Sequence, residues 1–121
     1  MGRPSIVETE PVELGDSELL AKILRALGDP SRLRIIEILM EHPAIQKELV
    51  AELRISQGQV SSHLSCLTWC GLVSGERRGR EVEYRIADPR VVGIVDLARS
   101  ILQRSTADIA ACRSVDSGTF E

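Results

Sequence analysis

The chain has 121 residues, of which 43% are hydrophobic, and a formal net charge of −3. This length and composition suit one domain with one hydrophobic core. No stretch approaches the roughly 20 apolar residues that cross a bilayer, and no basic start followed by an apolar run marks a signal peptide. We therefore expect a cytoplasmic protein with no membrane partner.

The charge is unevenly distributed along the chain. Residues 1–16 carry −3 and residues 114–121 carry −2, so residues 17–113 carry +2. A weakly basic middle permits DNA binding without demonstrating it. We expect a flexible N-terminal arm over 1–16, one domain over 17–104, and a C-terminal tail over 105–121 that is less regular.

Hydrophobic periodicity predicts four helices in the first part of the domain. The third and fourth are short, amphipathic and separated by a brief turn, which is the layout of a helix-turn-helix. The expected ranges are Ser17–Leu27, Ser31–Glu41, Ile45–Arg54, and a fourth helix that follows the Ile55–Gln57 turn and runs to about Cys70.

After Gly71 the hydrophobic period changes from helical to alternating. Leu72–Arg77 and Glu81–Ile86 alternate around an Arg-Gly-Arg turn, which predicts a β-hairpin. A last helix over Pro89–Gln103 has more apolar surface than one side of a lone helix requires, which favours an isologous homodimer. Together the elements predict a mainly α fold with a small β-hairpin, a homodimeric winged helix-turn-helix.

The start of the fourth helix has the residue types that read DNA. Short polar side chains at this end meet base edges and phosphates, with apolar side chains behind them. Gln can pair bidentately with adenine, and Ser can hold phosphate; an ordinary solvated helix face is the alternative. The predicted DNA-contacting residues here are Ser56, Gln57, Gln59, Ser61, Ser62 and His63. For His63 we expect contact with phosphate or solvent rather than with a metal, because His42 is distant in sequence.

Three arginines surround the tip of the predicted hairpin. Arg77, Arg78 and Arg80 flank Gly79, so a tight loop presents three cations to the DNA backbone or minor groove. A solvated turn is the alternative, and nearby glutamates partly offset the charge. Because the hairpin directly follows a helix-turn-helix, we predict that these arginines contact DNA.

Three cysteines are too few for a disulfide framework and suit metal binding in a reducing cytosol. Cys66 and Cys70 are four residues apart on one helix face, with Cβ atoms about 6 Å apart, so they can chelate one ion. Thiolates select soft ions, and Cys112 is the remaining thiol. Burial of the cysteines as core residues and a redox switch are the alternatives.

An enzyme is not expected from this sequence. There is no Cys-x-x-Cys motif, no Cys/His pair with a positioned third member, and no Gly-rich phosphate loop after a strand.

Several motifs occur in one order with characteristic gaps: Leu27–Ile35 (LGDPSRLRI), Ile55-Ser56-Gln57, Val60–Leu64 (VSSHL), Gly71-Leu72-Val73, and Arg78-Gly79-Arg80 with Tyr84. Over residues 17–103 the chain thereby resembles the ArsR/SmtB family of metal-sensing repressors. The resemblance implies a homodimer built on the first and last helices. It also implies binding to inverted-repeat operator DNA without metal, and release when an inducer binds.

The cysteine positions distinguish between sensor types within that family. The arsenic type has Cys-x-Cys in the third helix, but Ala44–Leu49 has no cysteine; the zinc and nickel/cobalt type uses the last helix, which here has no histidine. Residues 62–67 and 70–73 are similar to the mycobacterial cadmium/lead sensors, in which a tail cysteine of the other subunit joins two helix cysteines. The arm and tail differ from theirs.

That similarity implies that Cys66, Cys70 and Cys112 bind a soft heavy-metal inducer. Cadmium or lead is expected, and mercury is an alternative because related actinobacterial members respond to it. A redox- or arsenite-sensing repressor using the same cysteines is the competing hypothesis. No protein partner other than a second copy of the chain is implied, and whether Cys112 acts within or between subunits stays open.

Overall fold

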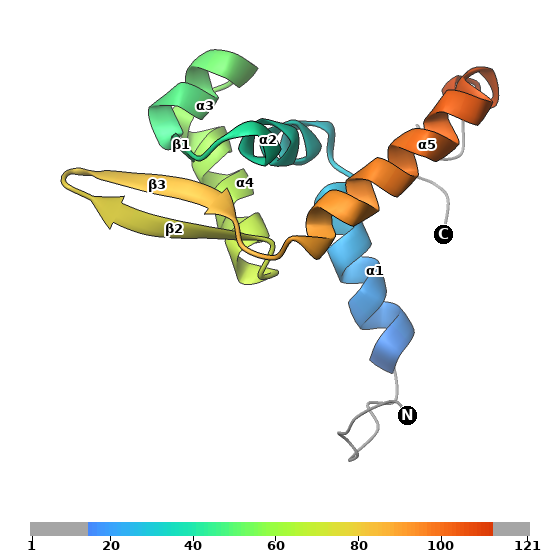
Figure 1. Ribbon diagram of the computed structural model, residues 1–121, viewed down its shortest axis with the longest axis horizontal. Helices are drawn as coiled ribbons and strands as arrows, with labels where there is room; N and C mark the ends of the chain where they lie inside the picture. The colour runs from blue at the N-terminus through green and yellow to red at the C-terminus, as the bar shows by residue number, and fades with distance from the viewer. Residues whose placement is uncertain (1–14, 113–121) are drawn as a thin grey trace. The chain divides into compact units, whose positions relative to one another are not determined.

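The computed structural model describes residues 15–112 (Figure 1). The described chain forms two compact units, one up to Ala87 and one from Asp88 onward. The elements, in chain order, are α1 (Gly15–Leu27), α2 (Pro30–Glu41), β1 (Ala44–Ile45), α3 (Gln46–Leu53), α4 (Gln57–Trp69), β2 (Val73–Arg78), β3 (Glu81–Ile86) and α5 (Arg90–Ala110). None of the helices within 15–112 is long and apolar enough to cross a membrane.

The first unit is organised around the packing of α2, α3 and α4. Asp29 caps α2 by accepting a hydrogen bond from the backbone N–H of Arg32 (3.0 Å), and Pro30 occupies the first helical position, where its missing N–H is not needed. The largest buried side chains from these helices are aliphatic and form the core: Ile35, Ile36, Leu49, Val60, Leu64 and Leu67. Apolar spacing at three and four residues therefore fixes which side of each helix faces inward.

A tight turn joins α3 to α4. Arg54 adopts the left-handed conformation (φ 60°) after α3, and Ser56 caps α4. The Ser56 hydroxyl accepts from the backbone N–H of Gln59 (3.1 Å), and the Gln59 side-chain oxygen accepts from the backbone N–H of Ser56 (3.0 Å). This reciprocal capping satisfies backbone donors that a helix start otherwise leaves without partners.

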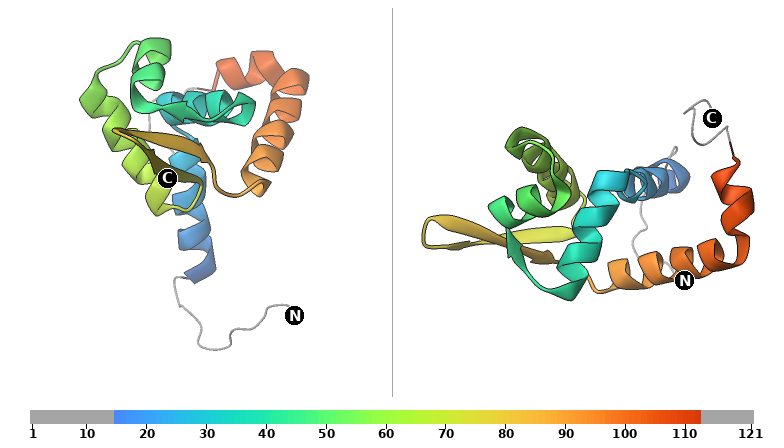
Figure 2. Two further views of the ribbon diagram at one scale, coloured as in Figure 1. Left: turned by 60° about the vertical axis from the view of Figure 1, so that its left-hand side comes forward. Right: turned by 90° about the horizontal axis from the view of Figure 1, so that it is seen from above.

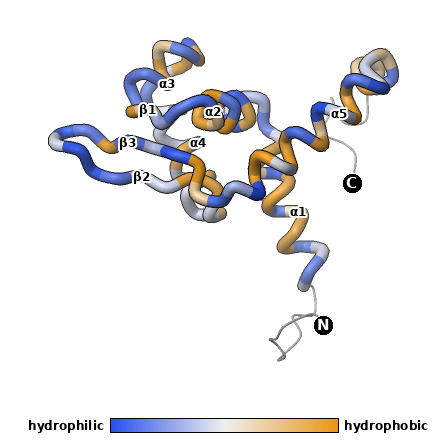
Figure 3. The backbone as a smooth tube through the Cα atoms, in the orientation of Figure 1, coloured by the Kyte–Doolittle hydropathy of each residue, from blue (hydrophilic) through white to orange (hydrophobic). Residues whose placement is uncertain are grey.

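The predicted hairpin is present as β2 and β3, with Arg78 opposite Glu81. Gly79 has φ +65°, a conformation that suits glycine at the turn of a two-residue hairpin loop. Gly75 lies opposite Tyr84, and a Cβ at Gly75 would come within 2.9 Å of the Tyr84 ring. The hairpin, called the wing below, projects from the helices (Figure 2), and its tip is hydrophilic (Figure 3).

The sheet has one strand more than the sequence predicted. Ala44 and Ile45 pair antiparallel with Tyr84 and Glu83, so the sheet order is β1-β3-β2. The predicted start of the third helix at Ile45 was therefore wrong by one residue. Two residues after a proline carry too little periodicity to reveal a strand, and pairing with β3 decides their conformation.

The second unit contains α5, which continues to Ala110, beyond the predicted end at Gln103. Ser105 has non-helical dihedrals (φ −134°, ψ 30°), so the helix is kinked there. The expectation of an irregular tail from Ser105 was wrong for residues 105–110. The expected boundaries after residues 16 and 104 both fall inside helices, and residues 1–14 of the expected arm and 113–121 of the expected tail lie outside the described residues.

Candidate nucleic-acid interface and thiol site

The N-terminal part of α4 with its cap, residues 56–62, is called the reading end below. Five of the predicted DNA-contacting residues lie here and are exposed: Ser56, Gln57, Gln59, Ser61 and Ser62. Val60 lies among them but is fully buried, which fixes the rotation of α4 about its axis. The reading end is therefore a polar surface on a helix that the core holds in one orientation.

The two glutamines of the reading end differ in what their side chains already bind. The side-chain oxygen of Gln59 is engaged by the backbone N–H of Ser56. Bidentate pairing with adenine requires both the oxygen and the amide nitrogen, so Gln59 would have to release its cap to make it. Within residues 15–112 no such bond occupies the Gln57 side chain, and its backbone oxygen accepts from Gln46 Nε2 (3.2 Å). Gln57 is therefore better placed than Gln59 for base contact.

His63 lies differently from the other predicted contacts. Its ring is half-buried, the Arg32 guanidinium donates to its Nδ1 (3.3 Å), and its Nε2 is 3.9 Å from Oδ2 of Asp29. Arg32 and Asp29 belong to the start of α2, so His63 ties the middle of α4 to that helix. The structure thus places His63 in a contact within the protein, apart from the exposed polar residues.

Arg32 also reaches the end of α1. Its Nε donates to the carbonyl oxygen of Ala26 (2.8 Å) and its Nη2 to that of Arg25 (3.3 Å). One guanidinium therefore connects α1, α2 and α4. Sequence reasoning did not assign Arg32 a role, although its position three residues after a cap was a signal of a fixed location.

The same contacts lower the pKa of the Asp29 carboxyl. Burial raises its pKa, but the hydrogen bond from the backbone N–H of Arg32 and the charges of Arg32 and His63 outweigh burial, so the pKa lies below its usual value. Asp29 is therefore ionised at neutral pH and complements the positive N-terminal end of α2.

The wing arginines are exposed but not equivalent. Arg78 forms ion pairs with Glu76 (3.4 Å) and Glu83 (3.2 Å), and Arg77 donates to the carbonyl oxygen of Gly79 (3.5 Å). Within residues 15–112, Arg80 has neither an ion pair nor a side-chain hydrogen bond. Arg80 therefore has the most available cation of the three for a phosphate.

The last turn of α4 with its C-cap, residues 66–70, carries Cys66 and Cys70 and is called the thiol end below. Both thiols are half-buried, and the backbone N–H of Cys70 donates to the carbonyl oxygen of Cys66 (3.1 Å). Burial raises the pKa of the Cys70 thiol, and the charge of Cys66 and a hydrogen bond between the two side chains raise it further, against the opposing charges of Arg32 and Lys22. The two cysteines lie one helical turn apart, which is the spacing that lets two side chains on a helix chelate one ion.

The donor set at the thiol end suits a soft ion but is incomplete by itself. Two thiols one turn apart supply two soft ligands, and a three-coordinate ion needs one more. Within residues 15–112 no three histidine, cysteine or acidic side chains come together as a metal-binding group. Cys112 lies in the second unit, two residues beyond α5, where its backbone N–H donates to the carbonyl oxygen of Ile109 (3.1 Å). Its predicted role therefore stays a prediction.

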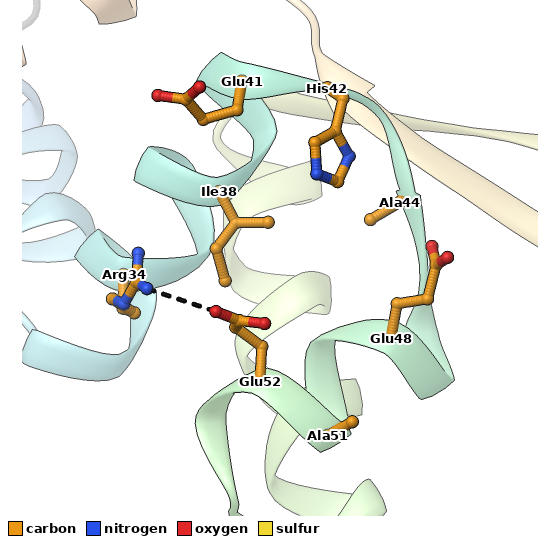
Figure 4. A pocket seen from close by; sticks show the side chains of 8 residues that line it. All are labelled: Arg34, Ile38, Glu41, His42, Ala44, Glu48, Ala51 and Glu52. Carbon is orange, nitrogen blue, oxygen red and sulfur yellow. Dashed lines mark hydrogen bonds and ion pairs between the residues drawn. The ribbon is translucent and has the colours of Figure 1, made fainter.

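A hollow of about 430 Å³ opens between α2 and α3 (Figure 4). Arg34 on its wall pairs with Glu52 (3.4 Å), and Glu48 accepts from the backbone N–H of Ile45 (2.9 Å) at the start of α3. These polar groups are satisfied within the protein, and neither the thiols nor the reading end line the hollow. We assign it no ligand.

An exposed, capped second helix of a helix-turn-helix, followed by a hairpin with a basic tip, defines the first unit as a winged helix-turn-helix domain. The comparisons agree: residues 29–74 match the model of the family described as bacterial regulatory protein, arsR family. The chain belongs to this family, and the predicted winged fold is confirmed.

Curated relatives cover most of the chain. It is 36% identical over 107 residues to the probable mercury resistance operon repressor of Streptomyces lividans, covering 88% of this chain and 86% of the relative. It is also 36% identical over 100 residues to the HTH-type transcriptional regulator CmtR of Mycobacterium tuberculosis, covering 82% and 85%. Among solved structures, that of M. tuberculosis Rv0081 superimposes with a TM-score of 0.72 at 30% identity, covering 78% of this chain and 96% of that one.

Proposed function

We propose that this protein is a homodimeric transcriptional repressor that binds operator DNA in the cytoplasm and releases it when Cys66, Cys70 and Cys112 bind a soft heavy-metal ion. The observation that carries the proposal is that one helix, α4, has an exposed polar surface at its first residues and two neighbouring thiols at its last. The regulators named above, one a mercury-operon repressor, support the class of protein.

DNA binding is assigned to the reading end and to the wing. The exposed side chains of Ser56, Gln57, Ser61 and Ser62 are available to base edges and phosphates, and Arg80 to the backbone. Arg77 and Arg78 are assigned electrostatic contacts with the DNA backbone. Gln59 acts mainly through its cap, and His63 through its contact with Arg32.

The dimer is assigned to α1 and α5, because both helices leave large apolar side chains in water. Leu19, Leu20 and Leu24 of α1 are each at least half exposed, and Leu97 of α5 is 69% exposed. An exposed apolar stripe on a monomer is costly and marks an interaction surface. A twofold dimer would cover both helices and place two copies of α4 on successive half-sites.

The three cysteines are assigned to the inducer. A soft ion, when bound, supplies bonds that draw three thiolates together. Cys66 and Cys70 lie one helical turn apart, so Cys112, from the same subunit or from the other, completes the site as the third thiolate. Binding of the ion by Cys112 would move α4 and break the contact of His63 with Arg32, or it would alter the spacing of the two α4 helices in the dimer. A small change in that spacing weakens operator binding.

The coupling is reciprocal by thermodynamic necessity: metal lowers DNA affinity by the factor by which DNA lowers metal affinity. Cadmium or lead is the inducer that we favour, with mercury as the alternative. The decisive experiment titrates metal-free protein on its own promoter fragment with cadmium, lead, mercury, arsenite and zinc. Both DNA release and thiolate-to-metal absorption are recorded.

Release at stoichiometric cadmium, lead or mercury, with matching absorption, is the expected result. The neighbouring thiols also suit a disulfide, so the same assay includes diamide followed by reductant. Release by diamide without any response to metal would replace the metal sensor by a redox sensor, and release by arsenite alone would identify an arsenite sensor.

A further inference from the structure

A second hollow, of about 310 Å³, lies where the start of α3, the first residue of α4 and the wing meet. Its polar lining includes Gln46 and Lys47 from α3, Gln57 from α4, and Arg80, Glu81 and Tyr84 from the wing. A water molecule occupies about 30 Å³ in the liquid, so the space holds a phosphate group together with bridging waters. The hollow is thus bordered by both elements to which DNA binding is assigned.

The cations of this hollow are poorly satisfied within the protein. Lys47 Nζ lies 3.5 Å from Glu81 Oε2, but the Lys47 side chain is 75% exposed. Exposed ion pairs of this kind contribute only about 0–1 kcal/mol, so the pair opens easily. Arg80 has no ion pair or side-chain hydrogen bond within the described chain, and the lining as a whole therefore favours an anion.

The position of Lys47 in its own helix points the same way. It is the second residue of α3, where the N-terminal end of the helix dipole disfavours a cation. Its aliphatic stem is exposed rather than packed, so burial does not explain the residue. A cation that its helix disfavours, next to an unpaired arginine, gains most when an anion binds between them.

We propose that this hollow receives a phosphate of the DNA backbone, held by Lys47 and Arg80. The Tyr84 hydroxyl supplies a neutral donor from the lining. The proposal rests on the proposed DNA-binding function and adds a contact from the first helix of the helix-turn-helix. A backbone phosphate positions the protein on the duplex without carrying sequence information. Glu81 then acts as an internal competitor that the phosphate must displace from Lys47.

The charge on Glu81 makes the proposal testable in two directions. Lys47→Gln should weaken binding to the promoter fragment and to a random duplex by the same factor. It should also lower the slope of log affinity against log salt by about 1 per subunit. Glu81→Gln should strengthen binding to both duplexes, because it frees Lys47. Lys22→Gln is the matched control, since it removes the same charge from α1 and should leave the slope unchanged.

Chemical protection supplies an independent measurement, because Lys22 and Lys47 are the only lysines of this chain. Amine acetylation is followed by mass spectrometry in buffer, in inorganic phosphate, and with the random duplex at equal ionic strength. We expect DNA to protect Lys47 and leave Lys22 reactive. Equal protection of Lys47 by inorganic phosphate alone would overturn the DNA contact in favour of a site for free phosphate.

Other outcomes separate this inference from the function on which it rests. If the wild-type protein binds DNA while Lys47 stays reactive and Lys47→Gln keeps the full salt slope, the hollow is not a phosphate site. If the wild-type protein binds neither duplex, the proposed function itself fails. Thermal unfolding of each variant checks that the exposed substitutions leave the fold intact.

Discussion

The two ends of α4 differ in nearly every physical property although they belong to one helix of 13 residues. The reading end is polar, exposed and closed by a reciprocal cap. The thiol end is half-buried at both cysteines, but its Trp69 is 89% exposed. Each end also has a side chain in the core, Val60 and Leu67, and Leu64 is buried between them, so one end cannot rotate without the other.

This difference indicates how one short helix can combine two tasks. Exposed polar groups at the reading end make and break contacts with DNA at little cost to the fold, because water replaces them. Half-buried thiols are shielded and have few alternative partners, so a change there is transmitted through the packed middle of the helix. The Arg32–His63 contact adds a second connection, from the middle of α4 to α1 and α2.

The largest expected effect is at the thiol end. Cys66→Ser or Cys70→Ser should reduce metal affinity by more than about 100-fold, because loss of a residue that merely supports a ligand already costs about 10–100-fold. Operator binding by the metal-free protein should be nearly unchanged, since neither thiol belongs to the reading end. Absorption titrations and DNA-binding assays on the same samples measure both.

Cys112→Ser should leave a two-thiolate complex that binds metal more weakly and releases DNA poorly. Ser65→Ala, on the exposed side of α4 between the two ends, is the matched control and should behave as wild type. Normal metal affinity together with normal release in Cys112→Ser would remove this residue from the site.

The next effect is at the wing. Arg80→Ala should weaken DNA binding across sequences and lower the salt slope by about 1 per subunit. Arg78→Ala should do so less, because Glu76 and Glu83 already neutralise much of its charge. DNA affinities of the two variants, measured at several salt concentrations, test whether Arg80→Ala has the larger effect. Equal losses of affinity would show that the ion pairs of Arg78 open freely on DNA.

A smaller effect is expected at the connection between α4 and α2. Asp29→Ala should lower the free energy of unfolding by about 0.5–2 kcal/mol, the usual cost of losing a helix cap. Asp29→Asn keeps the cap and removes the charge that faces Arg32 and His63. Urea unfolding of both variants separates the cap from the charge, and equal losses would assign the whole effect to charge.

At the reading end, Gln59→Ala should lower the free energy of unfolding by about 0.5–1.5 kcal/mol, as expected for loss of one hydrogen bond. It should change sequence preference little, because its oxygen serves the cap. Gln57→Ala should leave the free energy of unfolding unchanged and should relax the sequence preference at one base pair. Binding to a panel of single-substitution operators distinguishes them, and a specificity change confined to Gln59→Ala would contradict this assignment.

The smallest effect is expected at Asp88, which belongs to neither end of α4. The Arg90 side chain and backbone N–H donate to its carboxylate, and these bonds lower the Asp88 pKa from 3.8 to about 2. Because the folded-state pKa is the lower one, the stabilisation is fully present above the unfolded value and is lost as pH falls from about 4 to about 2.

Asp88→Asn should therefore destabilise the protein slightly at neutral pH, with a difference that disappears near pH 2. Urea unfolding at pH 7, 4 and 2 follows it, with Asp96→Asn on α5 as the control. Because the Arg90 side chain is 88% exposed, salt screens this ion pair, and a salt-independent difference would indicate a cause other than the pair.

Much of the architecture was predictable from local patterns. Apolar spacing identified the helices and the alternation around Gly79 identified the wing, because periodicities of 3.6 and 2 determine which side chains can share one face. The motifs from Leu27 to Tyr84 were enough to recognise the family. The proximity of Cys66 and Cys70 also followed from sequence, since a helix fixes the relation of residues four apart.

Contacts between distant segments were decided only by the tertiary structure. The pairing of Ala44 with Tyr84, the turn of His63 toward Arg32, and the difference between Arg78 and Arg80 each depend on which segments meet in space. Gln57 and Gln59 have the same side chain, and only the capping geometry assigns them different tasks. Sequence spacing determines local geometry because helices and strands have fixed periods. Arg32 and His63 are 31 residues apart, so they meet only because the core packs α2 against α4.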